Sequence, residues 1–590
     1  MAKRAHDGKG VAGRFLRLAG GYWSGSDRWR VRLLTVVLVG LTVCQLASPL
    51  LINLWSERLF DALEQRSMDR FLAMVGLVFG IIAFNIANTI LHLRIKRRLQ
   101  YEWRQWLTWR LMDGWVRRGR HHQVTYLAGD HDNPDGRIAE DVRIATETAI
   151  ELGLSLFYCV LLLLTFSGIL WRLSGTPVLA VGTLKMAVPG YLVYVALLYA
   201  AAGTTIATLL GRPLVRTTNR RQGFEADFRF ALGRVRENAQ TIALLHGEAE
   251  ERSRLRTLLE GVRAGWTRQT LALSNVTTFS AAYSVLSVAF PILVAAPRYI
   301  AGAITLGGLM QTAQAFQQTA SALTWPIDNL PSAAQLRASV ERILGLYDAL
   351  ERLDAEPAGA GRIFVERGAM PMLAFRALSI AEPDGRPVIA PFDAEVAPGD
   401  RVLISGDPGA AARLLRAVAR AWPWGGGSIL LPADARIFVL PRRPYLPGGP
   451  LRAALSYPAA PATVGDAEAV TALARVGLGH LAGRLDETDE GWKQMLPLGE
   501  QQRLGFARLL VRRPEWVFLE DSTDALDPAG EDEMFRLLGR ELPRATVLTI
   551  GNRAALELHH RRRMVLERGK DGAVRMHEVL APPLGGDRVA

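Results

Sequence analysis

The sequence predicts a multidomain fold, in which a six-helix transmembrane domain precedes an α/β domain. The chain has 590 residues, too many for one hydrophobic core. Hydrophobic residues make up 49% of it, the mean hydropathy is +0.12, and the apolar residues cluster in the first 325 positions. From about Arg367, short β-rich runs alternate with amphipathic helices, which is typical of an α/β domain. We therefore expect a transmembrane domain at 1–325, a helix and linker at 326–366, and the α/β domain at 367–590.

Six segments are long and apolar enough for membrane-spanning helices, which need about 20 mostly apolar residues. They cover 33–54, 72–92, 148–171, 186–211, 272–296 and 302–324. The last two are interrupted by Ser, Thr and Gln, and helices of this kind usually line the interior of a bundle. We expect these two to face other helices rather than lipid.

Basic residues indicate how the spans are oriented. The stretch after the second span contains Arg94, Lys96, Arg97, Arg98, Arg104, Arg110, Arg117, Arg118 and Arg120. The stretch after the fourth contains Arg212, Arg216, Arg220, Arg221, Arg229, Arg234 and Arg236. Since Arg and Lys collect in cytoplasmic loops, we expect a multi-pass protein of the inner (plasma) membrane, with both termini and both basic loops in the cytoplasm.

Composition excludes several classes of function. The net charge of +13 follows from the same loop rule and does not predict nucleic acid as a partner, because no base-reading or RNA-binding motif accompanies it. Cys44 and Cys159 both fall inside predicted spans and predict neither a disulfide framework nor a metal site. The polar, basic N-terminus is not followed by a short apolar core and a cleavage site, so we expect no signal peptide.

Carboxylates near the third span form a possible functional stripe. Glu140, Glu147 and Glu151 are spaced by seven and four, so they share one face of a helix entering that span. Carboxylates at membrane depth are costly unless they face protein or water. Two interpretations stay open: they cap a solvated helix end and pair with nearby Arg, or they form a substrate- or proton-binding stripe in a cavity. A similar face at the outer end of the first span, where we expect simple solvation, consists of Glu57, Asp61 and Glu64.

The α/β domain contains a weak candidate for a phosphate-binding loop. The run RVLIS (401–405) is followed by a turn and a helix, and a helix N-terminus stabilises anions. The pattern requires G-x-x-x-x-G-K-[ST]. Its first Gly is Gly406, but Ala411, Ala412 and Arg413 occupy the last Gly, Lys and Ser/Thr positions. Taken alone, the match is poor.

The later motifs of this domain are much more specific. LPLGEQQR precedes the helix LGFARLLVRRP and then WVFLEDSTDALD. This order resembles the signature motif, Walker B strand and D-loop of ABC-transporter ATPases. The signature positions are Leu496, Pro497, Leu498, Gly499, Glu500 and Gln501, and the D-loop positions are Asp524, Ala525, Leu526 and Asp527.

The membrane half supports the same resemblance. LWSERLFDALEQRSMDRF, NPDGRIAEDVR and FRFALGRVRENAQTIALLHGE are similar to stretches of ABC transporter subfamily D and of the related SbmA/BacA peptide transporters. The resemblance covers roughly residues 15–575. It implies an ABC exporter-type architecture, a half-transporter that forms a homodimer or heterodimer, and ATP and Mg²⁺ as cofactors. It also implies that NPDGRIAED is a coupling segment that docks on the nucleotide-binding domain.

Several positions depart from the family pattern where the nucleotide chemistry should occur. The substitutions are Ala412 for the Walker A Lys, Arg413 for the Mg²⁺-binding Ser/Thr, Arg442 for the Q-loop Gln, Pro497 for the signature Ser and Asn552 for the switch His. Walker B reads Glu520-Asp521 where the family has Asp-Glu, so Asp521 holds the position of the catalytic Glu. Gly406, Gly409 and Ala411 complete the nucleotide-binding positions.

These departures predict weak nucleotide chemistry. Phosphoryl transfer depends on positioning and charge stabilisation, and losing one stabilising donor typically costs about 10²–10³ in rate. We therefore expect a homodimer to hydrolyse ATP very slowly or not at all. Arg413 and Arg442 leave binding of a nucleotide or another anion open; in the alternative interpretation they are solvated or pair with Glu520 or Asp521.

Three hypotheses follow for the function. The first is an ABC-type transporter of a peptide-like, cobalamin-like or acyl solute, either as a homodimer or with an intact half-transporter. The second is a proton-coupled permease, since the SbmA/BacA relatives lack an ATPase domain; Glu140, Glu147 and Glu151 would be the coupling site and the α/β domain a dimerisation scaffold. The third is a non-transporting structural or regulatory membrane protein.

Overall fold

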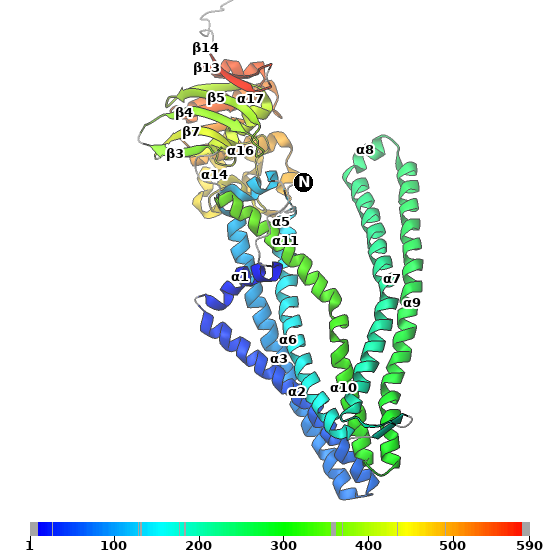
Figure 1. The fold of residues 1–590 in the computed structure, drawn as a ribbon. Coiled ribbons are helices and arrows are strands. Elements are labelled where there is room, and N and C mark those ends of the chain that lie inside the picture. Colours follow the sequence, from blue (N-terminus) through cyan, green and yellow to red (C-terminus); the bar gives the residue numbers. More distant parts are fainter. Residues whose placement is uncertain are drawn as a thin grey trace, which may run out of the picture. The chain divides into compact units, whose positions relative to one another are not determined.

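The computed structural model describes residues 10–580 apart from 26, 128, 130–131, 176–177, 182–183, 356–360, 369, 434, 490 and 571. The chain forms two compact units. One, which we call the helical unit, comprises Met1–Leu111 and Asn133–Leu344. The other, the α/β unit, comprises Met112–Asp132 and Gly345–Ala590. Figure 1 labels the elements of both.

Helices, most of them long, build the helical unit. They are α1 (Val11–Ser24), α2 (Arg28–Glu64), α3 (Met68–Val116), α6 (Val142–Ser174), α7 (Tyr191–Glu237), α8 (Ala239–Leu244), α9 (Glu248–Ile300), α10 (Leu306–Asp328) and α11 (Leu330–Ala355). The short turn α5 (Pro134–Gly136) precedes α6, and a hairpin of β1 (Val178–Val181) and β2 (Leu184–Ala187) precedes α7. Helices α7 and α9 run side by side and are joined by α8 (Figure 1).

The predicted spans correspond to helices of this unit. By length and composition, five helical stretches among the described residues could cross a membrane: Arg28–Glu64, Met68–Tyr126, Pro134–Ser174, Tyr191–Glu237 and Glu248–Ile300. The fourth begins at Tyr191 and not at 186 as predicted, because β2 and Gly190, whose φ is 71°, precede it. The sixth predicted span forms α10, which is not among the five because it contains many Gln, Thr and Ser residues.

Helix α10 lies in the interior of the helical unit, as its polar composition predicted. It packs against α2, α6, α7 and α9. Its buried positions are mostly small or polar: Gly307, Gly308, Leu309, Gln311, Thr312, Ala313, Ala315, Phe316, Thr319, Ala320 and Ala322. A Cβ added at Gly307 would lie 2.1 Å from the carbonyl oxygen of Glu57, so α10 can approach α2 this closely only with glycine there.

The acidic face at the end of α2 has a structural role that the sequence analysis missed. The backbone N–H of Leu306 donates to Glu64 Oε2 at 2.9 Å, and that of Gly307 donates to Asp61 Oδ1 at 3.1 Å. Gln311 Nε2 donates to Glu57 Oε2 at 2.9 Å. The expectation of simple solvation is therefore wrong. Glu64 and Asp61 accept the free N–H groups at the start of α10, and their negative charge is favourable beside the positive end of this helix.

The α/β unit is built on a ten-stranded sheet with the order β3-β7-β4-β5-β14-β13-β6-β12-β11-β8. Its strands are β3 (Phe364–Gly368), β4 (Leu373–Ala381), β5 (Pro387–Val396), β6 (Arg401–Gly406), β7 (Gly425–Pro432), β8 (Ile437–Leu440), β11 (Trp516–Glu520), β12 (Thr546–Ile550), β13 (Arg562–Arg568) and β14 (Val574–Leu580). A separate pair is β9 (Gly449–Pro450) with β10 (Thr488–Asp489). Its helices are α12 (Pro408–Val418), α13 (Leu451–Ser456), α14 (Asp466–Arg475), α15 (Trp492–Met495), α16 (Leu498–Arg512) and α17 (Pro528–Glu541).

The parallel part of this sheet positions the site. Strands β6, β12, β11 and β8 pair in parallel, and β11 and β12 are almost completely buried. Strands buried on both faces read as apolar runs, which explains why RVLIS, WVFLE and TVLTI stand out in the sequence. The carboxyl ends of parallel strands meet at one edge, where α/β proteins bind ligands. The loops after β6, β8, β11 and β12 therefore converge.

A segment between α3 and α6 packs within the α/β unit. Gln123 Nε2 donates to the carbonyl of Arg420 at 3.2 Å, and the Tyr126 ring lies 4.9 Å from that of Trp422. The NPDGRIAED segment, which we expected to dock on this domain, groups with the helical unit from Asn133 onward.

That grouping has a physical cause in α11. Arg137 Nη1 donates to the carbonyl of Arg342 at 2.9 Å, and Arg342 Nε donates to buried Asp141 at 2.7 Å. Arg137 and Asp141 of this segment thus hydrogen-bond to α11 within the helical unit.

We predict that Asp61→Ala lowers the stability of the helical unit by about 1 kcal/mol, because a backbone N–H at the start of α10 loses its acceptor. Asp61→Asn keeps an acceptor oxygen and should cost less. Urea unfolding of the protein in detergent, followed by tryptophan fluorescence, measures both. Glu341→Ala is the control, since it removes only an exposed pair with Arg337 and should cost well under about 1 kcal/mol. Equal losses for all three variants would contradict the capping role.

Candidate functional site

The predicted nucleotide-binding positions of this chain gather at the carboxyl edge of the parallel strands. Gly406 ends β6, Arg442 follows β8, Asp521 follows β11 and Asn552 follows β12. The sequence analysis thus placed these residues on the correct loops. The hydrogen-bond and ion-pair partners of the charged residues on these loops differ from those expected.

The phosphate-loop position is filled by a carboxylate. Gly406 has φ of 106°, and an added Cβ would lie 2.1 Å from the carbonyl oxygen of Leu566, so glycine is required. Helix α12 then begins directly at Pro408 with Asp407 as its N-cap. Asp407 Oδ1 accepts the N–H of Ala410 at 2.9 Å, and Oδ2 accepts Nη2 of Arg568 at 2.6 Å. An anion of the protein therefore occupies the helix N-terminus, the place where a phosphate would bind.

The charge of Asp407 is held in place by its surroundings. Burial by itself raises the pKa of this carboxyl, but the Ala410 N–H and the Arg568 guanidinium hold the pKa below its ordinary value. The sequence analysis missed this residue. The signal was the pair Asp407-Pro408, since Asp is favoured at the N-cap and Pro at the first position of a helix.

The switch position bonds to the same loop. Asn552 Oδ1 accepts the N–H of Gly406 at 2.7 Å, and Asn552 Nδ2 donates to the carbonyl of Gly406 at 2.9 Å. Both hydrogen-bonding groups of the amide are thus engaged by the backbone of the first glycine. Asn552 ties the loop after β12 to the loop after β6.

Arg413 is neutralised by a partner that the sequence did not indicate. Its guanidinium pairs with Glu382, donates to the carbonyl of Gly409 at 3.0 Å, and lies 5.4 Å from the ring centre of Trp422. The side chain is 28% exposed. It is therefore neither mainly solvated nor paired with Glu520 or Asp521, and its charge is not free for an anion.

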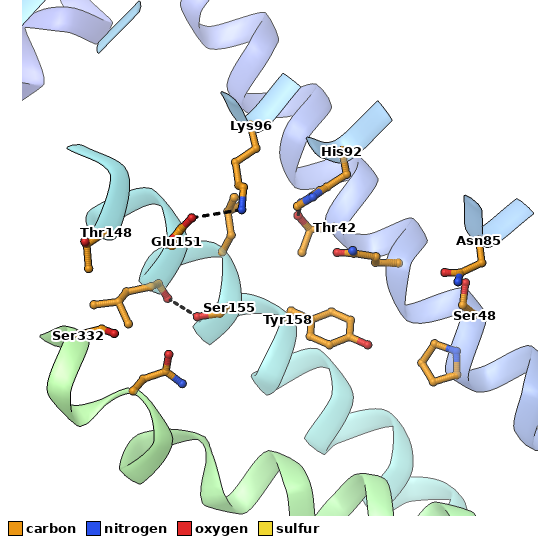
Figure 2. Close-up of a pocket in the computed structure, with 15 residues that line it drawn as sticks. Thr42, Ser48, Asn85, His92, Lys96, Thr148, Glu151, Ser155, Tyr158 and Ser332 are labelled. Carbon is orange, nitrogen blue, oxygen red and sulfur yellow. Dashed lines mark hydrogen bonds and ion pairs between the residues drawn. The ribbon is translucent and has the colours of Figure 1, made fainter. Parts of the chain in front are cut away.

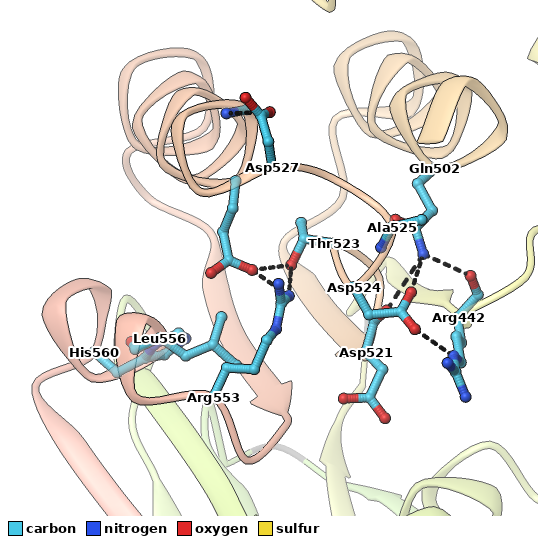
Figure 3. Close-up of polar contacts among 12 residues, drawn as sticks. Arg442, Gln502, Asp521, Thr523, Asp524, Ala525, Asp527, Arg553, Leu556 and His560 are labelled. Carbon is cyan, nitrogen blue, oxygen red and sulfur yellow. Dashed lines mark hydrogen bonds and ion pairs between the residues drawn. The ribbon is translucent and has the colours of Figure 1, made fainter. Parts of the chain in front are cut away.

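Arg442 is likewise bound to a neighbouring loop. Its Nε donates to Asp524, the first residue of the D-loop. Gln502 from α16 joins the same cluster: its Nε2 donates to the carbonyl of Arg442 at 3.0 Å, and its Oε1 accepts the N–H of Ala525 at 3.0 Å (Figure 3). Gln502 therefore holds the Q-loop and D-loop positions together, a role that the sequence analysis did not assign.

The two Walker B carboxylates keep their acidic character but not the usual pKa. Burial, followed by the neighbouring charge of Asp521, raises the pKa of Glu520. Burial, followed by Asp524, raises the pKa of Asp521. Among the described residues, no group of three or more His, Cys, Asp and Glu side chains could hold a metal ion.

The signature segment starts α16. Pro497 is the N-cap of this helix and makes no side-chain capping bond; it also has no N–H to donate. Glu500 lies in the first turn, where its charge opposes binding of another anion. Buried Gln501 shapes the preceding turn, since its Nε2 donates to the carbonyls of Lys493 and Leu496, both at 2.8 Å. Ala525, in the D-loop with Leu526 and Asp527, lies close to Gly499.

The structure separates the three candidate carboxylates near the third span. Glu140 is exposed, lies in the π-helical turn Arg137–Asp141 before α6, and is not one of the residues that line the cavity described below. Glu147 pairs with Arg143 at 3.4 Å. Glu151 pairs with Lys96 at 3.4 Å and lines a cavity. Glu147 thus fits the interpretation of a carboxylate paired with a nearby Arg, and Glu151 fits that of a carboxylate in a cavity.

Together, the helical unit and an α/β unit with these converging loops define the class of protein: a membrane half-transporter with a fused nucleotide-binding-type domain. Comparisons with known proteins agree. The family described as ABC transporter transmembrane region 2 matches residues 22–300. An uncharacterized ABC transporter ATP-binding protein of Haemophilus influenzae is 30% identical over 94% of this chain and 92% of its own length.

Further relatives and a solved structure are similar to this chain over most of its length. The inner membrane ABC transporter ATP-binding protein YddA of Escherichia coli is 28% identical over 91% of this chain and 94% of its own. The mouse lysosomal cobalamin transporter ABCD4 is 25% identical over 90% of both chains. A bacterial Atm1-family ABC exporter with ATP bound has the same fold, with a TM-score of 0.68 and 17% identity, covering 92% of this chain and 94% of that one.

The chain belongs to the ABC transporter family. It is a subfamily D-like half-transporter of the exporter fold and a multi-pass inner-membrane protein, as the sequence predicted. The family implies ATP and Mg²⁺ as ligands, and the names of the bacterial relatives given above call them ATP-binding proteins.

We predict that Asp407→Ser raises the affinity of the protein for inorganic phosphate and ATP by about 5–10-fold, because it removes a negative charge from the α12 N-terminus and keeps a capping oxygen. Isothermal titration of the purified protein measures this. Asp400→Ser is a matched control: Asp400 lies at the other end of β6, accepts the N–H of Ala397 and pairs with Arg562. Unchanged affinity in Asp407→Ser, or an equal rise in the control, would contradict the role of Asp407.

Proposed function

We propose that the chain is one half of a dimeric ABC-type inner-membrane transporter whose own nucleotide site hydrolyses ATP very slowly or not at all. The observation that carries this proposal is the carboxylate of Asp407 at the α12 N-terminus. A phosphate at this place would meet a fixed negative charge. The neighbouring positive charge of Arg568 is already used by that carboxylate.

Other departures support the same proposal. The residue in the Mg²⁺-ligand position, Arg413, is a cation directed to Glu382, and the signature position Pro497 lacks both a hydroxyl and an N–H. The residues present therefore do not fit an ATP–Mg²⁺ complex of the family type. The proposed role of Asp521 in the position of the catalytic carboxylate needs the ionised form, and burial opposes ionisation of both Asp521 and its neighbour Glu520.

The proposed solute is peptide-like, cobalamin-like or acyl, on the resemblance to subfamily D and to the cobalamin transporter ABCD4. Both termini and the basic loops lie in the cytoplasm in this proposal. A homodimer accords with two weak sites. A heterodimer with an intact half-transporter would place Pro497 opposite the partner's phosphate loop, which weakens that site as well.

We predict that the purified protein in lipid nanodiscs releases phosphate from Mg–ATP at least about 10²-fold more slowly than an intact relative, meaning an ABC transporter whose Walker A and signature motifs match the family pattern, assayed alongside. Asp521→Asn should leave the remaining rate unchanged, because no site-specific turnover is left to lose. Turnover equal to that of the intact relative and abolished by Asp521→Asn would overturn the proposal.

A second candidate function is a proton-coupled permease, in which the α/β unit serves as a dimerisation scaffold. It is favoured by one observation: Glu151 lines a polar cavity of the helical unit together with His92 and Lys96. A carboxylate and an imidazole in such a place can carry protons.

Uptake of a peptide-like, cobalamin-like or acyl solute into inverted and right-side-out membrane vesicles distinguishes the ATP-driven transporter from the proton-coupled permease. For the permease, a protonophore abolishes uptake and depletion of ATP leaves it unchanged. For an ATP-driven heterodimer, depletion of ATP abolishes uptake and a protonophore leaves it unchanged. Uptake by the Glu151→Gln variant then still depends on ATP. No uptake in either orientation would favour a non-transporting structural or regulatory role.

A further inference from the structure

The helical unit contains a polar cavity of about 500 Å³ between α2, α3, α6 and the start of α11. This volume is within the range of small-molecule sites. Figure 2 shows Lys96 and His92 on α3 facing Glu151 on α6, with Ser48 and Asn85 farther along α2 and α3. Hydroxyl and amide groups dominate the rest of the lining, in contrast to the apolar composition of the helices that form it.

One end of the cavity carries opposite charges. Lys96 Nζ lies 3.4 Å from Glu151 Oε1, longer than the usual 2.7–2.9 Å of a charge-assisted hydrogen bond. The Lys96 side chain is 20% exposed, and that of Glu151 is 48% exposed. His92 lies one helical turn from Lys96, on the same face of α3, and its Nε2 is 3.2 Å from Thr42 Oγ1. The charges are thus adjacent, loosely paired and open to the cavity.

The other end contains a buried hydroxyl that the protein does not satisfy. Ser48 is 7% exposed, and its Oγ has no hydrogen-bond partner among the described residues. Ser48 lines the cavity beside Asn85 (Figure 2). A buried polar group without a partner is unfavourable, and sites built to hydrogen-bond a ligand have such groups when empty.

We propose that this cavity binds a small zwitterionic solute, with its carboxylate at Lys96 and His92, its primary ammonium group at Glu151, and its polar remainder hydrogen-bonded toward Ser48. A ligand with a single charge would leave either Lys96 or Glu151 without a counter-charge, which is costly in a partly buried site. A zwitterion exchanges the loose Lys96–Glu151 pair for two new pairs with no change in net charge. The inference rests on the proposed transport function only in treating this solute as the transported one.

Binding to the full-length protein in nanodiscs tests the proposal without ATP or transport. The probe is radiolabelled dialanine, with alanine and trialanine included to vary the separation of the charges. N-acetyl-dialanine removes the ammonium group, and dialanine amide removes the carboxylate. We expect dialanine to bind at least about 10-fold more tightly than either blocked form, because each blocked form leaves one lining charge uncompensated.

Two variants assign the charges. Glu151→Gln should make dialanine and N-acetyl-dialanine bind equally, and Lys96→Gln should do the same for dialanine and its amide. The matched controls keep the preference of the unmodified protein. One control is Glu147→Gln: Glu147 lies one turn before Glu151 and pairs with Arg143. The other is Arg98→Gln: Arg98 lies near Lys96 and pairs with Glu102.

Several results overturn the proposal. These are no binding of alanine, dialanine or trialanine, equal binding of the charged and blocked forms, or unchanged selectivity in both variants. The comparison of ligands uses the unmodified protein, so it decides the question even where a variant fails to fold. Binding of dialanine without uptake would refute transport and leave the site standing; uptake with unchanged selectivity in Glu151→Gln would refute the site alone.

Discussion

The free N–H groups at the start of α10 are the constraint on which the helical unit depends. The first N–H groups of a helix have no acceptor within that helix, so they need partners from elsewhere. Here α2 supplies them through Asp61 and Glu64, and Gly307 allows the close approach that these bonds need. Since α10 packs against four other helices, fixing its end fixes the interior of the unit. A partly exposed acidic cluster in this way holds a helix that lies in the interior of the unit.

The same physical device has a different consequence in the α/β unit. Asp407 caps α12 as Asp61 and Glu64 cap α10. The N-terminus of α12, however, is the position at which a phosphate-binding loop holds phosphate. Arg568, Asn552 and Glu382 complete the arrangement by engaging Asp407, Gly406 and Arg413. Charges that could serve a nucleotide are instead paired within the protein.

The sequence predicted the fold well and the site only in part, for physical reasons. Apolar runs are local patterns, so the spans and the buried strands could be read directly, whereas the positions of Asp521 and Asn552 came from the resemblance to ABC-transporter motifs. The partner of Arg413 could not, because Glu382 comes from a distant turn that only the tertiary fold brings near. Spacing alone could not show which of Glu140, Glu147 and Glu151 lines a cavity, because only the tertiary fold brings Lys96 of α3 beside Glu151. Asp407 was readable as an N-cap and was missed beside the stronger expectation of a phosphate loop.

The contrast between the two units bears on where this protein recognises ligands. In the α/β unit, Arg413, Arg442 and Asp407 each have a close, well-directed partner, so a ligand would have to break a pair before forming its own. In the cavity of the helical unit, Lys96 and Glu151 are loosely paired and the Ser48 hydroxyl has no hydrogen-bond partner among the described residues, so the proposed zwitterion would have few interactions to replace. The free energy of binding is the difference between the interactions that form with the ligand and those that break within the protein, so the cavity offers the larger gain. The two proposals together therefore assign the more favourable ligand site to the helical unit.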